Sequence, residues 1–224
     1  MSHQQASSYP FLVHMESSVK PGGQVDLRNL VKKSSEALHK KGLSFGTYET
    51  VVGDVNLLHR FAGVKDLNSI AGVEVLENAI EEGHGAAHVA GHFESYQNLI
   101  EDEVISVWRY EPELSVHAQG VEEFPKFMLY MRTHFAPGTQ KEAMDLIKSS
   151  AKAFQAKGNG VSFITSSTVV GDIDVIHRLT PLKSLDAIGG IEVLEGALGE
   201  GAQEHFKQYK EIVRDEEISL LRRV

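Results

Sequence analysis

Cysteine is absent from this chain of 224 residues, and so is any long apolar run. Zero cysteines exclude disulfides, thiolate metal sites and a cysteine nucleophile, and they fit a reducing, cytoplasmic location. No apolar run reaches the roughly 18–20 residues that a membrane-spanning helix needs. The first ten residues, MSHQQASSYP, lack the basic and apolar regions of a signal peptide. We therefore expect no membrane partner.

Basic residues are also in the minority, with 22 Lys and Arg against 31 Asp and Glu and a net charge of −9. This balance argues against a nucleic-acid partner. The sequence has no glycine-rich phosphate loop, nucleophile elbow or dinucleotide fingerprint. A hydrophobic content of 42% and a charged content of 24% are typical of a globular protein. We expect the protein to bind a small-molecule substrate. The sequence leaves open whether it forms a homodimer.

The sequence contains an internal duplication. Residues 51–83 align without a gap on residues 169–201, and seventeen of the 33 pairs are identical. This spacing is far longer than the roughly 20–50 residues of a solenoid repeat and matches a small domain. We expect two domains and a connector, which are residues 1–112, a linker at 113–123, and residues 124–224.

The two copies differ in length at one place. Residues 92–110 pair with 205–223, and this pairing requires five extra residues in the first copy between Gly83 and His92. The insertion contains His84 and His88, which the second copy lacks. The insertion is therefore a candidate place for a function added after the duplication.

Hydrophobic periodicity predicts an α+β fold in which each copy runs strand, helix, strand, strand, helix, strand, the ferredoxin-like order. In the first copy the expected elements are 10–18, 24–41, 44–52, 55–63, 67–80 and 103–110, with a Gly53-Asp54 turn inside the hairpin. The helix over 24–41 is expected to bury Val25, Leu27, Leu30, Val31, Ala37 and Leu38. Each four-stranded sheet leaves one face bare, so we expect the two sheets to cover each other as an intrachain barrel with a ligand cavity.

The hairpin motif Gly-Asp-(Ile/Val)-(Asn/Asp)-x-(Ile/Leu)-His-Arg, in this β-α-β-β-α-β context, resembles the dimeric α+β barrel superfamily. Within it the chain resembles the NIPSNAP-type proteins, as a tandem duplication over residues 9–110 and 124–224. The resemblance implies a fold shared by cofactor-free monooxygenases, haem-dependent enzymes, isomerases, polyketide cyclases and members without known activity. One departure is Arg60, with its twin Arg178, where NIPSNAP-type proteins often have Trp.

A metal site is suggested by His84, His88 and His92, which stand at i, i+4 and i+8. On a helix such residues stack on one face about 6 Å apart, a spacing that grips transition metals. Glu81 and Glu82 offer a carboxylate ligand. The ion would be a divalent transition metal (Fe, Zn, Mn, Ni or Cu), with haem the less favoured cofactor. Residues 83–91 contain three glycines, which are unfavourable in a helix interior. The alternative is therefore that this stretch forms a solvated bulge.

A second group of candidates lies on the first strand of each copy. His14 and Glu16 share one parity in copy one, and Tyr130 and Arg132 take the matching places in copy two, followed by His134. If this parity faces the cavity, these groups supply a general acid and base, with Arg132 holding an anionic or enolate oxygen. The alternative is a partly wet sheet face.

His59 and Arg60 are adjacent on the third strand, and His177 and Arg178 repeat them. Adjacent strand residues point to opposite faces, so one of each pair faces the helices and the other faces the barrel interior. His59 is a catalytic candidate, and a hydrogen-bonded core histidine is the alternative.

These patterns favour an enzyme of the oxygenase, isomerase, lyase or cyclase type that acts on a hydrophobic metabolite between the two sheets. A non-catalytic ligand-binding or interaction protein of the NIPSNAP-like type is the alternative. We expect the two halves to be functionally unequal, with copy one providing more of the ligand or metal contacts.

Overall fold

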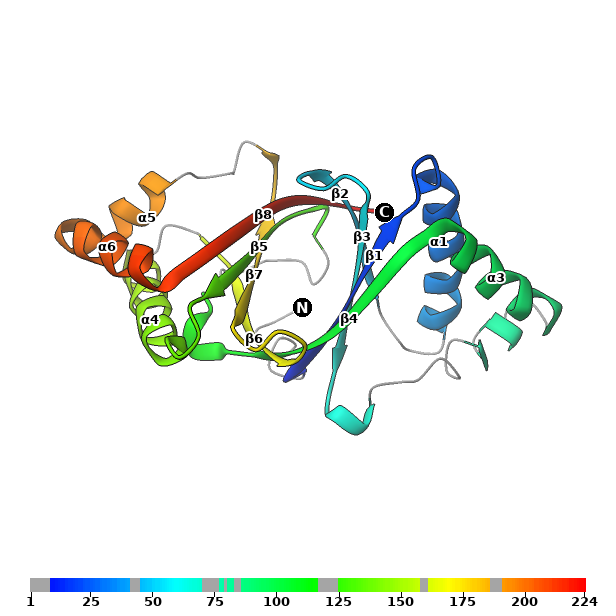
Figure 1. The fold of residues 1–224 in the computed structure, drawn as a ribbon, viewed down its shortest axis with the longest axis horizontal. Coiled ribbons are helices and arrows are strands. Elements are labelled where there is room, and N and C mark those ends of the chain that lie inside the picture. Colours follow the sequence, from blue (N-terminus) through cyan, green and yellow to red (C-terminus); the bar gives the residue numbers. More distant parts are fainter. Residues whose placement is uncertain are drawn as a thin grey trace.

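The structure is a computed structural model, and it describes residues 9–40, 45–69, 77–78, 80–82, 86–116, 125–157, 161–185 and 191–224. Along the described residues, eight strands follow in the predicted order with helices between them (Figure 1). Most of the helix expected over 67–80 lies outside the described residues. The first half contains β1 (Phe11–Val19), α1 (Gln24–Lys40), β2 (Gly46–Val52), β3 (Leu57–Val64), the 3-10 turn η2 (Leu67–Ser69), α3 (Ala86–Leu99) and β4 (Ile100–Tyr110).

The second half repeats this order after the 3-10 turn η3 (Pro112–Leu114). Its elements are β5 (Phe127–Phe135), α4 (Gln140–Lys157), β6 (Ile164–Val170), β7 (Val175–Leu182), α5 (Ile191–Leu198), the 3-10 turn η5 (Gly199–Gly201), α6 (Ala202–Ile212) and β8 (Val213–Arg223). The fold class is therefore α+β, as the sequence predicts.

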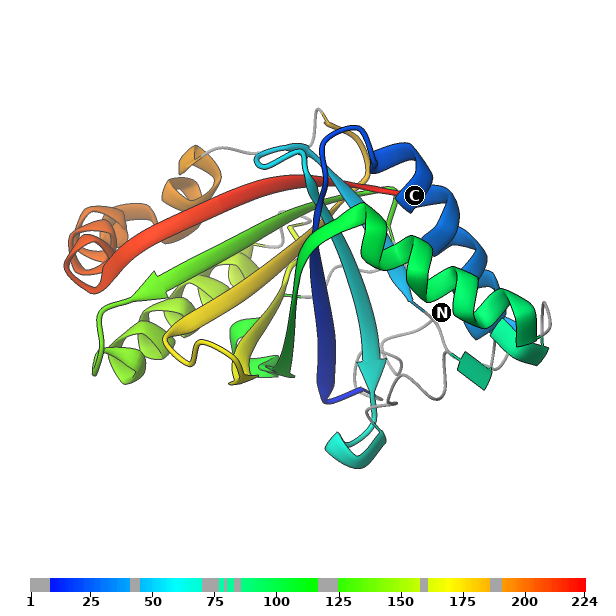
Figure 2. The same ribbon diagram turned by 45° about the vertical axis from the view of Figure 1, so that its right-hand side comes forward.

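The strands form a closed barrel in the order β1-β3-β2-β8-β5-β7-β6-β4, and all neighbouring pairs are antiparallel. The two halves are joined at two seams, where β2 pairs with β8 and β4 pairs with β6. The sheets thus cover each other's bare faces and also hydrogen-bond along both edges. Figure 2 shows the long strands β4 (green, continuing from α3) and β8 (red) in the wall of the barrel.

The helices lie outside the barrel on opposite sides, α1 and α3 with one half and α4, α5 and α6 with the other (Figure 1). Buried apolar residues fill the space between helices and strands. In the first half this core contains Val19, Leu27, Val31 and Leu58. In the second half a matching core contains Leu114, Phe135, Ala143, Ile147 and Ile176. The barrel interior is therefore enclosed by a separate layer of packing.

Each hairpin turn is built from the Gly-Asp pair. Gly53 and Gly171 have φ angles of 112° and 122°, in the left-handed region that favours glycine. The Asp54 carboxylate accepts a hydrogen bond of 3.0 Å from the backbone N–H of Asn56, and Asp172 does the same in the second half. These pairs form the predicted turns.

Three details differ from the expectations. Val25 is 59% exposed, because it stands about 200° around the helix from the buried Leu27. Strand β4 begins at Ile100 and not at residue 103, directly after α3. Three residues of the polar connector, Leu114, Ser115 and Val116, are buried, and Val116 forms a bridge with Phe163.

Within the described part of the chain, no helix is both long and apolar enough to cross a membrane.

Candidate functional site

Alternate residues of β1 and β5 point into the barrel, and this arrangement decides the parity that the sequence leaves open. The inward residues are Leu12, His14, Glu16, Met128, Tyr130 and Arg132. The four site residues predicted on the first strands therefore share one space. His59 joins them, because β3 places it opposite Glu16 in the β1–β3 pairing.

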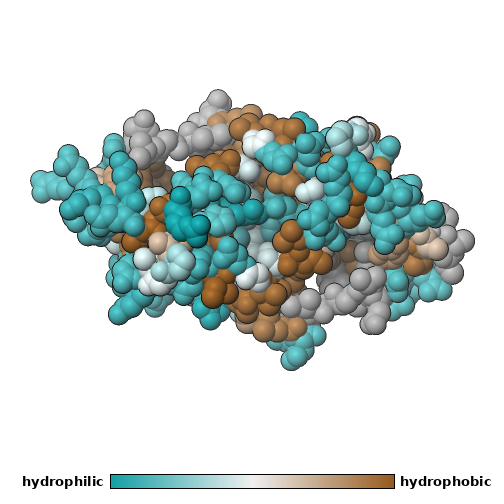
Figure 3. Space-filling view, viewed as in Figure 1, coloured by the Kyte–Doolittle hydropathy of each residue, from teal (hydrophilic) through white to brown (hydrophobic). Residues whose placement is uncertain are grey.

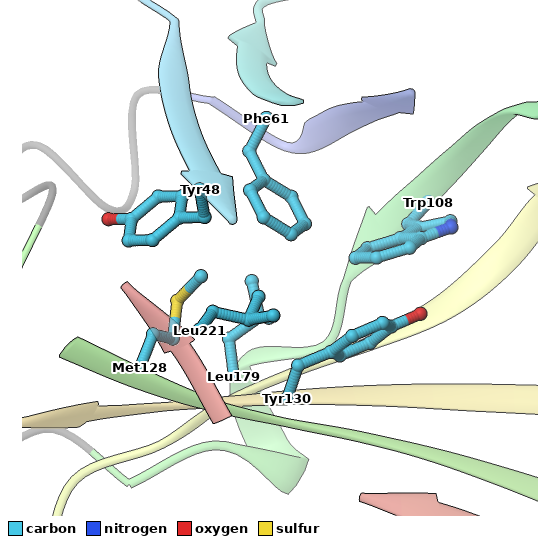
Figure 4. Close-up of a cluster of buried hydrophobic side chains, with 7 residues drawn as sticks. All are labelled: Tyr48, Phe61, Trp108, Met128, Tyr130, Leu179 and Leu221. Carbon is cyan, nitrogen blue, oxygen red and sulfur yellow. The ribbon is translucent and has the colours of Figure 1, made fainter. Parts of the chain in front are cut away.

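One level of the interior is filled with apolar side chains from both halves (Figure 4). The buried members of this cluster are Tyr48, Phe61, Trp108, Met128, Tyr130, Leu179 and Leu221. The rings of Trp108 and Tyr130 are stacked, with centroids 5.8 Å apart. At this level packed side chains occupy the place of the ligand cavity that we expected between the sheets.

Next to this core lie the polar residues of the first half. His14 Nε2 is 3.1 Å from His59 Nδ1, and the Glu16 carboxylate lies 3.6 Å from the same His59 nitrogen. On the other side of the ring, His59 Nε2 is 3.1 Å from Thr50 Oγ1. Both imidazoles are buried, at 2% and 1% exposure. The two histidines and the carboxylate thus form a compact group.

The second half contributes a matching group. Tyr130 Oη is 2.9 Å from His177 Nδ1, and Arg132 Nε donates to Tyr130 Oη at 3.2 Å. His177 Nε2 lies 3.0 Å from Thr168 Oγ1, as His59 does from Thr50. The Arg132 guanidinium also donates to the Glu16 carboxylate, which joins the two groups across the barrel.

Trp108 is the member of the apolar core that contacts these polar groups. Its indole stacks on the His177 ring with centroids 3.8 Å apart and an interplanar angle of 7°. The His14 ring is 4.5 Å away, centroid to centroid. The indole N–H donates to Ser106 Oγ at 2.8 Å. The only tryptophan of the chain therefore contacts both halves of the candidate site.

Burial keeps the histidines of the site uncharged. Burial and the nearby Arg132 lower the pKa of His59 and that of His177 to about 3. Burial is also the main reason why the pKa of His14 lies well below its usual value, and the neighbouring His59 is the second cause. Burial raises the pKa of the Tyr130 phenol. At neutral pH the site holds neutral imidazoles and a protonated phenol.

One end of this polar cluster reaches solvent. Trp108 is fully buried, whereas the side chains of Glu16, Arg132 and Glu217 are 14%, 23% and 56% exposed. Three valines at this end are exposed: Val52, Val104 and Val170, with exposed fractions of 60%, 54% and 54%. Each stands two residues along its strand from an inward-facing polar residue. Apolar patches also interrupt the polar surface in Figure 3.

Arg60 faces the helices, on the opposite side of β3 from His59. Its guanidinium donates to Tyr96 Oη and to the Glu103 carboxylate, which also accepts from Ser17 Oγ at 3.0 Å. The twin Arg178 is buried against the Phe163 ring, 4.7 Å from its centroid. The prediction that His59 and Arg60 face opposite ways is confirmed. Arg60 therefore connects α3 to the sheet.

The predicted metal ligands of the insertion are not brought together in the described residues. His84 lies outside them, and only the backbone of His88 is described, within α3. His92 is also in α3, with its ring 5.5 Å from that of Phe93. A metal site on these three histidines stays a prediction. The twin of His92, His205, bonds to Ser150 at 3.0 Å between its Nε2 and Oγ.

A hollow of about 270 Å³ lies outside the barrel, between α1 and the β2–β3 hairpin. It is lined partly by Arg28, Glu49 and Arg222, where Glu49 accepts from both arginines. Thr50 borders this hollow while its hydroxyl contacts His59 inside the barrel. The hollow is therefore separate from the polar cluster.

No family model and no curated protein matches this chain. Solved structures do match. A candidate monooxygenase from Fusobacterium nucleatum is 12% identical, with a TM-score of 0.63 over 96% of this chain and 93% of that one. An anthrone oxidase-like protein gives 12% identity and a TM-score of 0.63, over 97% and 92%. Chlorite dismutase from Candidatus Nitrospira defluvii, in complex with imidazole, gives 10% and 0.53, over 97% and 93%.

The fold is the closed α+β barrel of these solved structures. At these identities the likeness shows the fold and nothing more. Both halves of the α+β barrel are included, because the matches cover nearly the whole chain. The narrower NIPSNAP-type kinship is not shown by these neighbours.

Three parts of the site were not assigned a role from the sequence. The sequence marks His177 only as the twin of His59, and the prediction gives no role to the hydroxyl partners Thr50 and Thr168. The sequence did hold a signal for the threonines, since they occupy equivalent places in the duplicated hairpin strands. The stacking of Trp108 on His177 depends on the β4–β6 seam, which no local pattern predicts.

Proposed function

We propose that this protein is an enzyme that acts on a small, largely apolar molecule at the polar end of the barrel. The observation that carries the proposal is the buried cluster of neutral imidazoles, a carboxylate, a phenol and a guanidinium that reaches solvent at one end. Proton-transfer catalysis needs such groups within hydrogen-bond reach of one another. The exposed valines at this end support a substrate with an apolar body.

Each predicted residue has a role in this proposal. Arg132 and the Tyr130 hydroxyl would hold an oxygen on which negative charge develops, as in an oxyanion hole. His59 is the proposed proton acceptor. A buried imidazole is a weak base, and the Glu16 carboxylate, 3.6 Å from His59 Nδ1, stabilises the charge that the proton brings. His14 shares the proton with His59 across 3.1 Å.

The reaction class that fits these roles is removal of a proton next to a carbonyl or from a phenol, followed by isomerisation, cyclisation or reaction with oxygen. The fold likeness to a candidate monooxygenase and an anthrone oxidase-like protein supports this range. We also propose that the two halves descend from one ferredoxin-like unit and are related to NIPSNAP-type proteins. The repeated element order and the Gly-Asp hairpins support that descent.

A panel of small aromatic and carbonyl compounds would test the function. The purified protein is incubated with each compound, binding is followed by thermal shift, and products are detected by mass spectrometry. We expect turnover that falls roughly 10²-fold or more in His59→Gln, and weaker binding in Arg132→Lys, which loses the planar fork of donors. Arg109→Lys, on an exposed arginine, is the matched control.

Turnover that persists in both site variants would contradict the proposal. Binding without turnover in the wild type would identify a ligand-binding protein instead.

A further inference from the structure

We infer that His14, Glu16 and His59 form the binding site of one divalent transition-metal ion. The sequence placed such an ion on other histidines, His84, His88 and His92. The three ligand atoms of the inferred site come from β1 and β3, and all lie within 4.8 Å of one another. The inference rests on the proposed function for the position of the site, and with the ion bound His14 and His59 act as ligands in place of their proton-transfer roles. Metal binding is measured without a substrate and is therefore tested separately.

The spacing of the ligand atoms fits a common metal position. Ions bound by imidazole and carboxylate have metal–ligand distances of about 2.0–2.2 Å, so neighbouring ligand atoms stand roughly 3.0–3.5 Å apart. In this site His14 Nε2 and His59 Nδ1 are 3.1 Å apart, and His59 Nδ1 and Glu16 Oε2 are 3.6 Å apart. A metal ion would replace the proton that the two imidazoles share in the metal-free form.

Neighbouring groups already orient these ligands. His59 Nε2 lies 3.1 Å from Thr50 Oγ1. With Nε2–H donating to that oxygen, the Nδ1 lone pair faces His14 and Glu16, which is the tautomer that metal binding requires. Arg132 bonds to the Glu16 carboxylate and fixes its position. The charge of Arg132 is shared with Glu217, 3.3 Å from Arg132 Nη1. Glu16 therefore keeps part of its negative charge for a cation.

The donor set restricts the class of metal. Two imidazoles and one carboxylate suit Fe, Mn, Co, Ni, Zn or Cu as divalent ions, and they leave coordination positions open for a substrate. A hard ion such as Ca²⁺ prefers six to eight oxygens, which two nitrogens and a carboxylate do not supply. The chain has no cysteine, so no thiolate competes for the ion.

The second half serves as an internal control, because its equivalent residues are Tyr130, Arg132 and His177. The threonine behind the histidine is kept, as Thr168. In the second half a guanidinium replaces the carboxylate, and a phenol replaces the first imidazole. His177 is therefore the one suitable ligand that remains among these three residues. Both halves thus provide the same strand positions and the same threonine behind the histidine. Among these matching positions, only the first half carries the three metal ligands.

Cobalt titration of the full-length protein, after removal of metals with a chelator, tests the site. Two signals are followed together: the visible d–d absorption of bound Co²⁺ and the fluorescence of Trp108, whose indole lies 4.5 Å from the His14 ring. We expect both to saturate at one equivalent. In Glu16→Gln and His59→Ala the affinity should fall by roughly 100-fold or more, since even second-shell losses cost about 10–100-fold.

His177→Ala is the matched control, and its d–d absorption should saturate with unchanged affinity. Circular dichroism confirms that each variant folds, and the near-isosteric Glu16→Gln keeps the test valid if His59→Ala does not fold. Loss of Co²⁺ binding in a His84→Ala/His88→Ala double variant, with binding retained in Glu16→Gln, would overturn the inference. So would a folded wild type that binds no Co²⁺. Either result leaves the proposed function standing, because turnover of the compound panel is measured separately.

Discussion

At the residue scale, single side chains make two similar half-barrels chemically different. His14 stands where the second half has Tyr130, and Glu16 stands where it has Arg132, while His59 and His177 are kept. One half therefore offers nitrogen and carboxylate lone pairs, and the other offers a hydroxyl and a positive charge. The Glu16–Arg132 ion pair joins the two. This division underlies the proposed unequal roles of the halves.

The buried histidine of the second half should make stability depend on pH. The pKa of His177 is about 3 in the folded protein and near 6.5 in the unfolded chain, because burial disfavours the charged ring. The unfolded state therefore binds more protons below pH 6.5. The stability associated with the neutral ring is fully present above about pH 6.5 and is lost as the pH falls toward 3.

Urea unfolding at pH 7 and at pH 4.5 measures this effect. Between the two pH values, the wild type should lose on the order of 2–3 kcal/mol more unfolding free energy than His177→Gln. His14 and His59 are present in both proteins, so their contributions cancel in the comparison. Equal pH dependence in the two proteins would refute the assignment.

At the element scale, the β2–β3 and β6–β7 hairpins are the units that the duplication preserves best. Each has a glycine at positive φ followed by an aspartate that bonds to the backbone two residues on. The hairpins also deliver Thr50, His59, Thr168 and His177 to the interior. The geometry of the turn therefore fixes the register of the site residues.

Alanine at these turns should be costly. Gly53→Ala and Gly171→Ala should each lower the unfolding free energy by about 1–3 kcal/mol, because an L-residue is strained at positive φ. At Gly53 the new Cβ would also meet Ser219 Oγ at 2.7 Å, a contact that rotation of the serine can relieve. Gly91→Ala, in α3 with open space around it, should stabilise by about 0.5–1 kcal/mol. Urea unfolding that ranks Gly91→Ala with the two turn variants would contradict this account.

At the scale of the whole molecule, neither half is complete without the other. The seams β2–β8 and β4–β6 supply the hydrogen bonds that close the barrel. The interior core takes Tyr48, Phe61 and Trp108 from one half and its remaining buried residues from the other. Separation would expose this apolar layer and two strand edges, which are sites for pairing with another chain.

A fragment of residues 1–115, produced alone, should therefore aggregate or dimerise with itself. In a self-dimer, β2 and β4 of a second copy would take the places of β6 and β8. Size-exclusion chromatography with light scattering measures the state, and co-expression with residues 116–224 should restore a one-to-one complex. A stable, soluble monomer of the fragment would show that closure of the barrel is dispensable.

The sequence by itself determined the features that depend on local periodicity and on repetition. The duplication predicted two halves, alternation identified the strands, and Gly53-Asp54 located the hairpin turn. Parity also grouped His14 with Glu16 and Tyr130 with Arg132, because side chains two apart on a strand share a face. Only the choice of face was left open.

Tertiary structure decided everything that joins residues from distant strands. The contact between His14 and His59, the Glu16–Arg132 pair and the stacking of Trp108 on His177 all depend on which strands pair and where the barrel closes. The same closure filled the expected cavity with Tyr48, Leu179 and their neighbours. Periodicity records which face a side chain occupies, whereas these contacts arise from long-range pairing and close packing of the interior, which no local pattern encodes.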